Sequence, residues 1–420
     1  MSKHQSAAAA QPLGPTLMRP QTIAPTALLS SAHYSNITVP ATSVKLISTQ
    51  YHFATDLSSK LSGCLDLTNF TVVGVLGFDG VGKSTLMSLL HAAHERLPNK
   101  QQPPPSRESP LPATRQKKRG SNNTSSSNSP SKSSPVFDPQ DFETLLAGDH
   151  ETTGVDMVLS HDPTGASSNS FVLLDTQPML SSAMLCDLLS KNESSRFGAL
   201  TPEQQVEVHS YQLATFLLSI CHYVVIAHDT LADLQVVRFL QQVEAKMQNC
   251  RLPNISGGVK DRHVAKLLFV ANGLPDAVLL FKEQRVLARH VQALEKAWPG
   301  GFYRTSRHVS LFAQDDHENE DLALNRQQPQ EKIPLFVIPK RPSSATATSF
   351  SNYEDYDDSV LRWQRFVQRL PNAPSFSKNP AMHHTMNLRE WLSNASRVFE
   401  SVRKSGVFTA EYHSTGRDHH

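Results

Sequence analysis

The 420-residue sequence lacks the features of secreted, membrane-spanning and nucleic-acid-coating proteins. It has four cysteines, none in a C-x-x-C pair, so neither a disulfide framework nor a zinc site is indicated. No apolar run approaches the roughly eighteen residues that cross a membrane, and residues 7–10 are too short for a signal-peptide core. The net charge of +2 gives no global attraction to nucleic acid. We therefore expect a soluble cytoplasmic protein with free thiols, Cys221 being a buried one.

Proline and serine are abundant, and their distribution predicts the domain organisation. The chain has 27 prolines, and residues 1–40 and 99–135 show no periodic apolar pattern, so we expect both segments to be disordered. The rest suffices for one α/β domain of about 250–300 residues. We assign the domain to residues 41–98 and 136–345, C-terminal helices packed on it to 346–412, and a tail to 413–420.

One motif dominates the sequence. Gly77-Phe78-Asp79-Gly80-Val81-Gly82-Lys83-Ser84 fits the G-x-x-x-x-G-K-[ST] template, between a β-branched run at residues 70–76 and a helical pattern beyond it. Such a loop aims successive backbone N–H groups at an anion, and its lysine reaches the β- and γ-phosphates. The sequence therefore predicts a phosphate loop that binds a nucleotide. The binding residues would be Gly77, Asp79, Gly80, Val81, Gly82, Lys83, Ser84 and Thr85.

Strands alternate with helices along the rest of the chain. This alternation predicts a P-loop, G-domain-like α/β fold with a mostly parallel, doubly wound sheet. The helix after Thr201 has a capping box, with Pro202 in its first turn and Gln204 at the third position. We expect strands at 70–76, 157–159 (an edge strand), 170–175, 222–227, 265–271 and 333–338 (whose Pro334 indicates a strand start or an edge), and helices at 45–65, 83–97, 201–221, 231–247, 277–298, 359–370 and 387–404.

The last predicted helix carries an apolar stripe. Two hypotheses account for it: packing on the sheet, or a face that binds a partner. The stripe consists of Leu388, Trp391, Leu392, Ala395, Val398, Phe399 and Val402.

A second acidic element complements the phosphate loop. Asp175 ends an apolar strand about ninety residues later, where a Walker B acid would meet Mg²⁺. Thr152 or Thr153, just before Gly154, lies where a switch threonine would sense the γ-phosphate. We take Ser84, Asp175 and Thr153 as the candidate Mg²⁺ ligands.

Two departures from signalling GTPases bear on activity. A signalling GTPase has a glycine three residues after this strand-end acid, whereas Asp175 is followed by Thr176-Gln177-Pro178, and proline has no N–H with which to bind a γ-phosphate. In place of N-K-x-D the chain has Asn272-Gly273-Leu274-Pro275-Asp276, so Asn272 remains a base-binding candidate while ATP and GTP/GDP stay open. We therefore predict a nucleotide-holding scaffold rather than an enzyme. An active NTPase with atypical switch motifs is the alternative.

A basic run at residues 115–119 raises a third hypothesis, direct RNA binding, which a single run and a near-neutral net charge do not favour. We interpret the run as a solvated loop, with a nuclear-import or phosphate-binding patch as the alternative.

Several blocks resemble the ninth SMG factor of nonsense-mediated mRNA decay. They span residues 45–412 outside the insertions, and Asp175-Thr176-Gln177-Pro178 is the most specific of them. The resemblance implies a regulatory subunit that forms a heterodimer with the eighth SMG factor. It also implies that the pair binds and restrains a phosphatidylinositol-3-kinase-related protein kinase, which phosphorylates an RNA helicase. Lys83, Ser84 and Thr85 occupy the matching phosphate and metal positions. The other blocks are residues 72–90, 150–156, 210–222 and 387–412.

Overall fold

The protein is described from a computed structural model. The structure describes residues 39–95, 135–161, 170–191, 200–230, 233–255, 263–275, 335–342, 354–370 and 386–414, apart from short gaps within these ranges, and five positions between 279 and 296. All of them belong to one compact unit, residues 37–420. Among them, no helix is long and apolar enough to cross a membrane.

Seven strands form one sheet in the order β1-β3-β4-β2-β5-β6-β7. Five neighbouring strands, from β4 to β7, are parallel, whereas β3 runs antiparallel to β4 and β1 antiparallel to β3. The predicted mostly parallel α/β fold is therefore confirmed. The strands are β1 (Val44–Ile47), β2 (Phe70–Leu76), β3 (Val155–Ser160), β4 (Ser170–Thr176), β5 (Tyr223–His228), β6 (Lys266–Leu274) and β7 (Leu335–Pro339).

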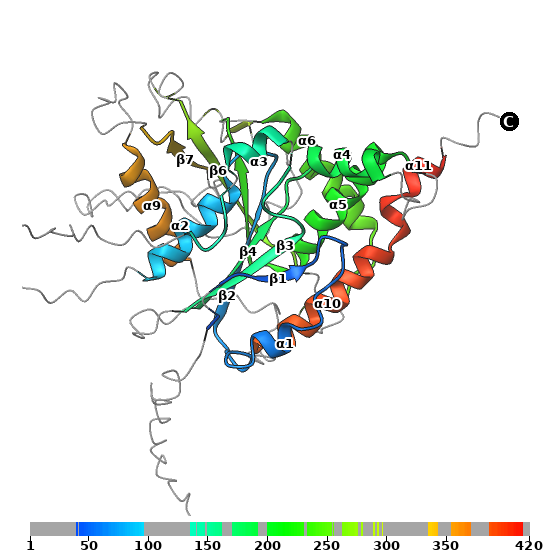
Figure 1. Ribbon diagram of the computed structural model, residues 1–420, viewed down its shortest axis with the longest axis horizontal. Coiled ribbons are helices and arrows are strands. Elements are labelled where there is room, and N and C mark those ends of the chain that lie inside the picture. The colour runs from blue at the N-terminus through cyan, green and yellow to red at the C-terminus, as the bar shows by residue number, and fades with distance from the viewer. Residues whose placement is uncertain are drawn as a thin grey trace, which may run out of the picture. The chain divides into compact units, whose positions relative to one another are not determined.

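Helices cover both faces of the sheet (Figure 1). On one face, α2 (Lys83–Glu95) and α9 (Tyr356–Gln368) share a core with alternate residues of β2 and β5. On the other face, α5 (Pro202–Ile220), α6 (Leu234–Asn249) and α10 (Leu388–Lys404) form the larger core. The shorter helices are α1 (Leu57–Lys60), α3 (Phe142–Ala147), α4 (Ser182–Lys191), the 3₁₀ turn η5 (Gly406–Phe408) and α11 (Ala410–Ser414).

Two predictions about the first elements are wrong. Residues 45–65 do not form a helix: Leu46 lies in strand β1, and only the four residues of α1 are helical. The apolar residues of this segment are nonetheless buried in the same core, because strand, turn and short helix all face α5 and α10. Strand β3 is not an edge strand, because β1 pairs along its outer side.

Other predicted elements are confirmed. Thr201 caps α5 through the predicted capping box, with reciprocal bonds to Gln204. Strand β7 is at the edge of the sheet and begins directly after Pro334. The basic run at 115–119, Asp276 and most of the helix expected at 277–298 lie outside the described residues.

The apolar stripe of α10 is buried within this chain. All seven of its residues are part of the core under α5, and the Trp391 indole donates to the carbonyl of Ile220 at 3.0 Å. The Trp391 ring also meets Phe70 of β2 edge-on. The stripe therefore packs on α5 and the sheet, and a partner-binding role for it is excluded by its burial.

Two histidines secure the end of β2 that lies opposite the phosphate loop. The buried ring of His222 accepts from Val72 N at 2.9 Å, and the backbone N–H of His222 donates to Val72 O. His263 contacts the carbonyl oxygen of Cys221 at 2.6 Å. Burial lowers the pKa of His222 well below its usual value and lowers the pKa of His263 to about 4.

These histidines predict a loss of stability in mild acid. The unfolded state binds protons below about pH 6.5, whereas the native state keeps both rings neutral down to about pH 4 for His263. The free energy of unfolding should therefore fall by about 1.4 kcal/mol per pH unit for each histidine as the pH drops through this window. Urea denaturation between pH 7.5 and 4.5 measures this slope. His263→Gln should lower this slope by the contribution of one histidine, about 1.4 kcal/mol per pH unit, and an unchanged slope would contradict this assignment.

Candidate nucleotide-binding site

The phosphate loop lies where the winding of the sheet reverses. Strand β2 is flanked by β4 on one side and β5 on the other, and in open α/β sheets ligands bind at the carboxyl ends of such strands. Gly80 and Gly82 have φ of 72° and 79°, which favour glycine. A side chain at Gly82 would also meet Asn272 at 2.5 Å. The residues after β2 therefore form an anion-binding turn at the start of α2.

Lys83 of the loop and Asp175 at the end of β4 are buried in an arrangement that a bound phosphate and cation would complete. The Lys83 amine donates to the Phe78 carbonyl at 2.9 Å, and burial lowers its pKa to about 8 against the opposing carboxylates of Asp175 and Asp79. Burial raises the pKa of Asp175, while the hydrogen bond from Ser84 and the charge of Lys83 oppose that change. Both groups would be stabilised in their charged forms by a phosphate and a divalent cation.

Three oxygen-bearing side chains gather next to the loop. Asp175 Oδ2 accepts from Ser84 Oγ at 2.7 Å and from Thr152 Oγ1 at 2.9 Å. The second oxygen of Asp175, Oδ1, is buried without a hydrogen-bond partner. Hydroxyl and carboxylate oxygens are the ligands that Mg²⁺ prefers, so these residues fit a magnesium ion bound with a nucleotide.

The threonine in this group is Thr152 rather than Thr153, the residue chosen from the sequence. Thr153 instead contributes its backbone carbonyl, which accepts from Lys45 Nζ at 2.8 Å. The sequence alone could not decide between the two threonines. Which of their side chains faces Asp175 depends on the left-handed backbone at Gly154, in the turn before β3.

The segment around Gly154 is fixed from two sides. Gly154 N donates to the side-chain oxygen of Gln177 at 2.9 Å, and Gln177 N donates to Gly154 O at the same distance. On the other side, Lys45 of β1 bonds to Asp156 at 2.8 Å as well as to Thr153. Gln177 is thus a structural residue here, and neither its pairing nor that of Lys45 was evident from the sequence.

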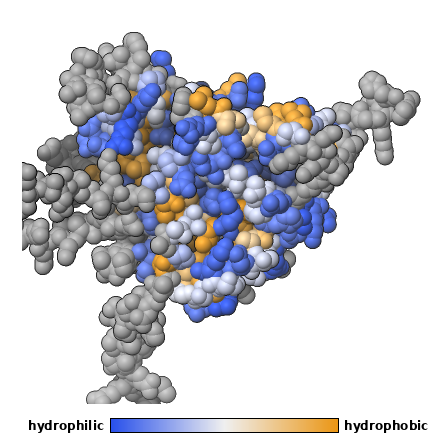
Figure 2. Space-filling view, viewed as in Figure 1, coloured by the Kyte–Doolittle hydropathy of each residue, from blue (hydrophilic) through white to orange (hydrophobic). Residues whose placement is uncertain are grey.

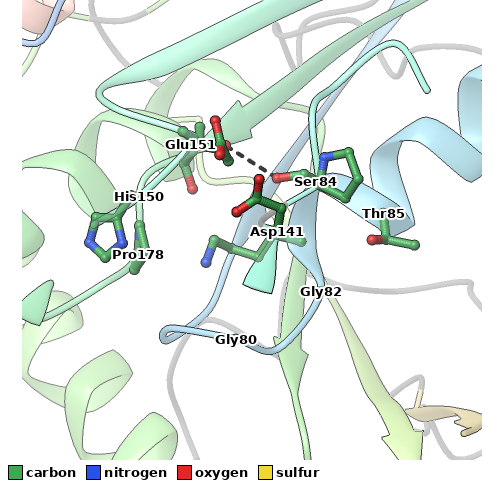
Figure 3. Close-up of a pocket in the computed structure, with 12 residues that line it drawn as sticks. Gly80, Gly82, Ser84, Thr85, Asp141, His150, Glu151 and Pro178 are labelled. Carbon is green, nitrogen blue, oxygen red and sulfur yellow. Dashed lines mark hydrogen bonds between the residues drawn. The ribbon is translucent and has the colours of Figure 1, made fainter. Parts of the chain in front are cut away.

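A cleft of about 390 Å³ opens above the phosphate loop. Figure 3 shows Gly80, Gly82 and Ser84 on one side, with His150, Glu151 and Pro178 opposite and Asp141 drawn between them. Asp79 of the loop reaches across to α4, where its Oδ2 accepts from Ser182 Oγ at 2.9 Å. The cleft is lined by Gly80, Gly82, Lys83, Ser84, Thr85, Pro139, Asp141, His150, Glu151, Thr152, Thr176 and Pro178.

Asn272, the predicted base-binding residue, is hydrogen-bonded to the backbone of the phosphate loop. Asn272 Nδ2 donates to the Val81 carbonyl at 2.9 Å, which holds β6 against the phosphate loop. Strand β6 then continues through an exposed Gly273 at φ 69° to Leu274, which pairs with β7. The residue that replaces the usual lysine is therefore part of a bulge in the sheet.

A phosphate loop at the reversal point of a mostly parallel sheet, with an acid at the end of the adjacent strand, defines a P-loop, G-domain-like nucleotide-binding fold. The chain is 31% identical to the nonsense-mediated mRNA decay factor SMG9 of Xenopus tropicalis over 386 residues. It is 26% identical to the same factor of Xenopus laevis over 386 residues and 29% identical to that of Salmo salar over 385. The chain belongs to this SMG9 family of nonsense-mediated mRNA decay factors.

These alignments cover 87% of this chain and 66% of each relative, so the chain spans about two thirds of their length. No family model matches it. Among solved structures, the septin GTPase domain from Chlamydomonas reinhardtii matches 82% of this chain and 98% of that one, with 12% identity and a TM-score of 0.24.

Replacing the loop lysine tests the phosphate site. Lys83→Ala should weaken nucleotide binding by about 1.5–3 kcal/mol, because a charged hydrogen bond to phosphate is lost. Calorimetry on the full chain measures the effect. Lys60→Ala, which removes an exposed lysine paired with Asp56 on α1, is the matched control and should bind as wild type does. Equal affinity of Lys83→Ala and wild type would remove the phosphate-loop assignment.

Proposed function

We propose that this chain is a non-catalytic, nucleotide-holding regulatory subunit of the mRNA-surveillance machinery in the cytoplasm. The observation that carries the proposal is the pairing of Gln177 with Gly154, because it engages the side-chain oxygen and the backbone N–H of this glutamine with the segment before β3. Pro178 supports it, since this residue lines the cleft but has no N–H for a terminal phosphate. No arginine lies among the described residues that line the cleft.

A fixed switch segment fits the same function. In nucleotide-driven switches, the segment before β3 is ordered by the γ-phosphate and released on hydrolysis. Here, Gln177 and Lys45 already hold this segment through contacts that involve no nucleotide. The bound nucleotide and Mg²⁺ would then stabilise one conformation of the domain rather than drive a cycle between two. Its base remains open between adenine and guanine.

The proposed partners are the eighth SMG factor, in a heterodimer, and a phosphatidylinositol-3-kinase-related protein kinase that the pair restrains. Membership of the SMG9 family of nonsense-mediated mRNA decay factors supports a role in that pathway. Exposed leucines also support a protein partner: Figure 2 shows apolar patches in the region of α3, α4 and α6. Leu146, Leu189 and Leu234 on these helices are 70%, 60% and 59% exposed.

Co-expression with the eighth SMG factor tests this proposal. We expect a one-to-one complex on gel filtration that lowers the kinase's phosphorylation of a helicase-derived peptide. Leu189→Glu should weaken the complex, whereas Ser190→Glu, which places the same charge at the neighbouring exposed position of α4, is the matched control. A kinase equally active with and without the complex would contradict the regulatory role.

A further inference from the structure

The C-terminal end of the described chain is held against α5 and α6 by charged and hydroxyl groups. Glu411 of α11 accepts from Lys246 Nζ of α6 at 2.6 Å, and Tyr412 Oη donates to Glu207 Oε2 of α5 at 2.5 Å. Burial raises the pKa of Tyr412, and the bond to Glu207 raises it further, so the hydroxyl stays protonated and remains the donor. Two adjacent residues of α11 thus contact groups of opposite charge on two neighbouring helices.

Lys246 is buried to an extent that is unusual for a lysine. Its side chain is 9% exposed, and lysines are rarely buried unless they are paired. Its ammonium group lies 4.9 Å from the centre of the Tyr211 ring. That ring stacks on Phe239 at 5.2 Å, and its hydroxyl donates to Gln242. The buried cation therefore lies over an aromatic ring, and Glu411 supplies the carboxylate that compensates its charge.

The helix that carries Glu411 is weakly anchored compared with the turn before it. Phe408 of η5 is fully buried, and η5 contacts both α5 and α6. Beyond it, α11 has five residues, of which Ala410 and Glu411 are exposed and Tyr412 is partly buried. Chain ends with few buried apolar contacts open at a low cost in free energy. Helix α11 can therefore leave its place while η5 and α10 stay packed.

We propose that Glu207, Tyr211 and Lys246, which we call the latch surface, form a docking site for a short helical segment in which a glutamate is followed by a tyrosine. Helix α11 fills this site in cis, and a partner protein that presents the same two side chains displaces it. Charge complementarity carries the proposal, because Lys246 selects a carboxylate and Glu207 selects a hydroxyl donor beside it. A second carboxylate in place of the tyrosine would meet Glu207 with like charge. None of these residues lines the nucleotide cleft, so the proposal does not depend on nucleotide binding.

Titration of a peptide against the full chain tests this proposal. The probe is a fluorescein-labelled peptide of residues 409–416, and fluorescence anisotropy measures its binding. Wild type should bind it weakly, because α11 competes in cis at an effective concentration on the order of millimolar. The double variant Glu411→Gln, Tyr412→Phe, which weakens the cis contacts, should bind it about tenfold more tightly. A peptide with the same two replacements is the matched control and should bind neither chain.

Further changes within the double variant locate the peptide on the latch surface. Lys246→Met, which removes the charge and keeps an unbranched side chain, should abolish peptide binding. Arg238→Met, an exposed change about two turns earlier on α6, should not affect it. Thermal unfolding shows whether Lys246→Met is folded, and Glu207→Gln replaces it if it is not.

Three results would overturn the proposal. The first is equal binding, or no binding, by wild type and the double variant. The second is binding that survives the loss of the Lys246 charge or, where that variant does not fold, the loss of the Glu207 charge. The third is self-association of wild type in sedimentation that is lost in the double variant, because it would assign the latch surface to a second copy of this chain.

Discussion

Gly154→Ala is expected to destabilise the domain by about 2–5 kcal/mol. The backbone of Gly154 has φ of 69°, which costs an alanine about 1–2 kcal/mol. A Cβ there would also lie 2.2 Å from the carbonyl oxygen of Ile47, an atom of strand β1 that cannot move away without breaking the edge of the sheet. The overlap adds about 1–3 kcal/mol, and the two bonds to Gln177 would be strained as well.

Gly273→Ala is the matched control for this variant. Gly273 has the same φ of 69°, but nothing lies within 4 Å of the position that a Cβ would take. Gly273→Ala should therefore lower the free energy of unfolding only by the cost of an alanine at positive φ, about 1–2 kcal/mol. Chemical denaturation of both variants measures the difference. Equal losses would show that strand β1 does not hold the segment at Gly154 in place, and the fixed switch segment would lose its main support.

Trp391→Ala should cost about 3–5 kcal/mol in the free energy of unfolding. The indole is fully buried between α10, α5 and β2, and truncation leaves a large cavity. The Ile220 carbonyl also loses its hydrogen bond from the Trp391 indole N–H, at 3.0 Å. The measurement is denaturation of the full chain without any partner.

Ser393→Ala, an exposed change two residues along the same helix, is the control and should be nearly neutral. A Trp391→Ala variant as stable as wild type would mean that α10 does not pack on this domain in solution. The second sequence-based hypothesis, a partner-binding face, would then return.

Much of the fold follows from local patterns. The phosphate loop is recognisable because its glycines, lysine and serine have a fixed spacing between a buried strand and a helix. The capping box formed by Thr201 and Gln204 likewise predicts where α5 begins. Strand β1 could not be found in this way, because Leu46 and Leu57 fit a helical spacing while the structure brings them to one core from a strand and a separate turn of helix.

The candidate site was predictable where the motif determines it and not where contacts between distant segments do. Ser84 and Asp175 come together as expected from a phosphate loop and a strand-end acid, at 2.7 Å. The pairing of Gln177 with Gly154 joins residues 23 positions apart, and that of Lys45 with Asp156 joins residues 111 apart. Neither pair has a sequence signature, because each depends on the register of the antiparallel strands β1, β3 and β4. The choice of Thr152 over Thr153 depends on the same register.

The measurement that tests the account most directly is the fate of the nucleotide on the purified full chain bound to its proposed partner. The nucleotide that copurifies is identified by chromatography and mass spectrometry, and phosphate release from added ATP and GTP is then followed over hours. We predict one bound nucleotide per chain and no more than a single turnover, because Gln177 is engaged by Gly154 and Pro178 has no N–H. Steady multiple-turnover hydrolysis that is lost in Lys83→Ala would contradict the account and make the protein an active NTPase.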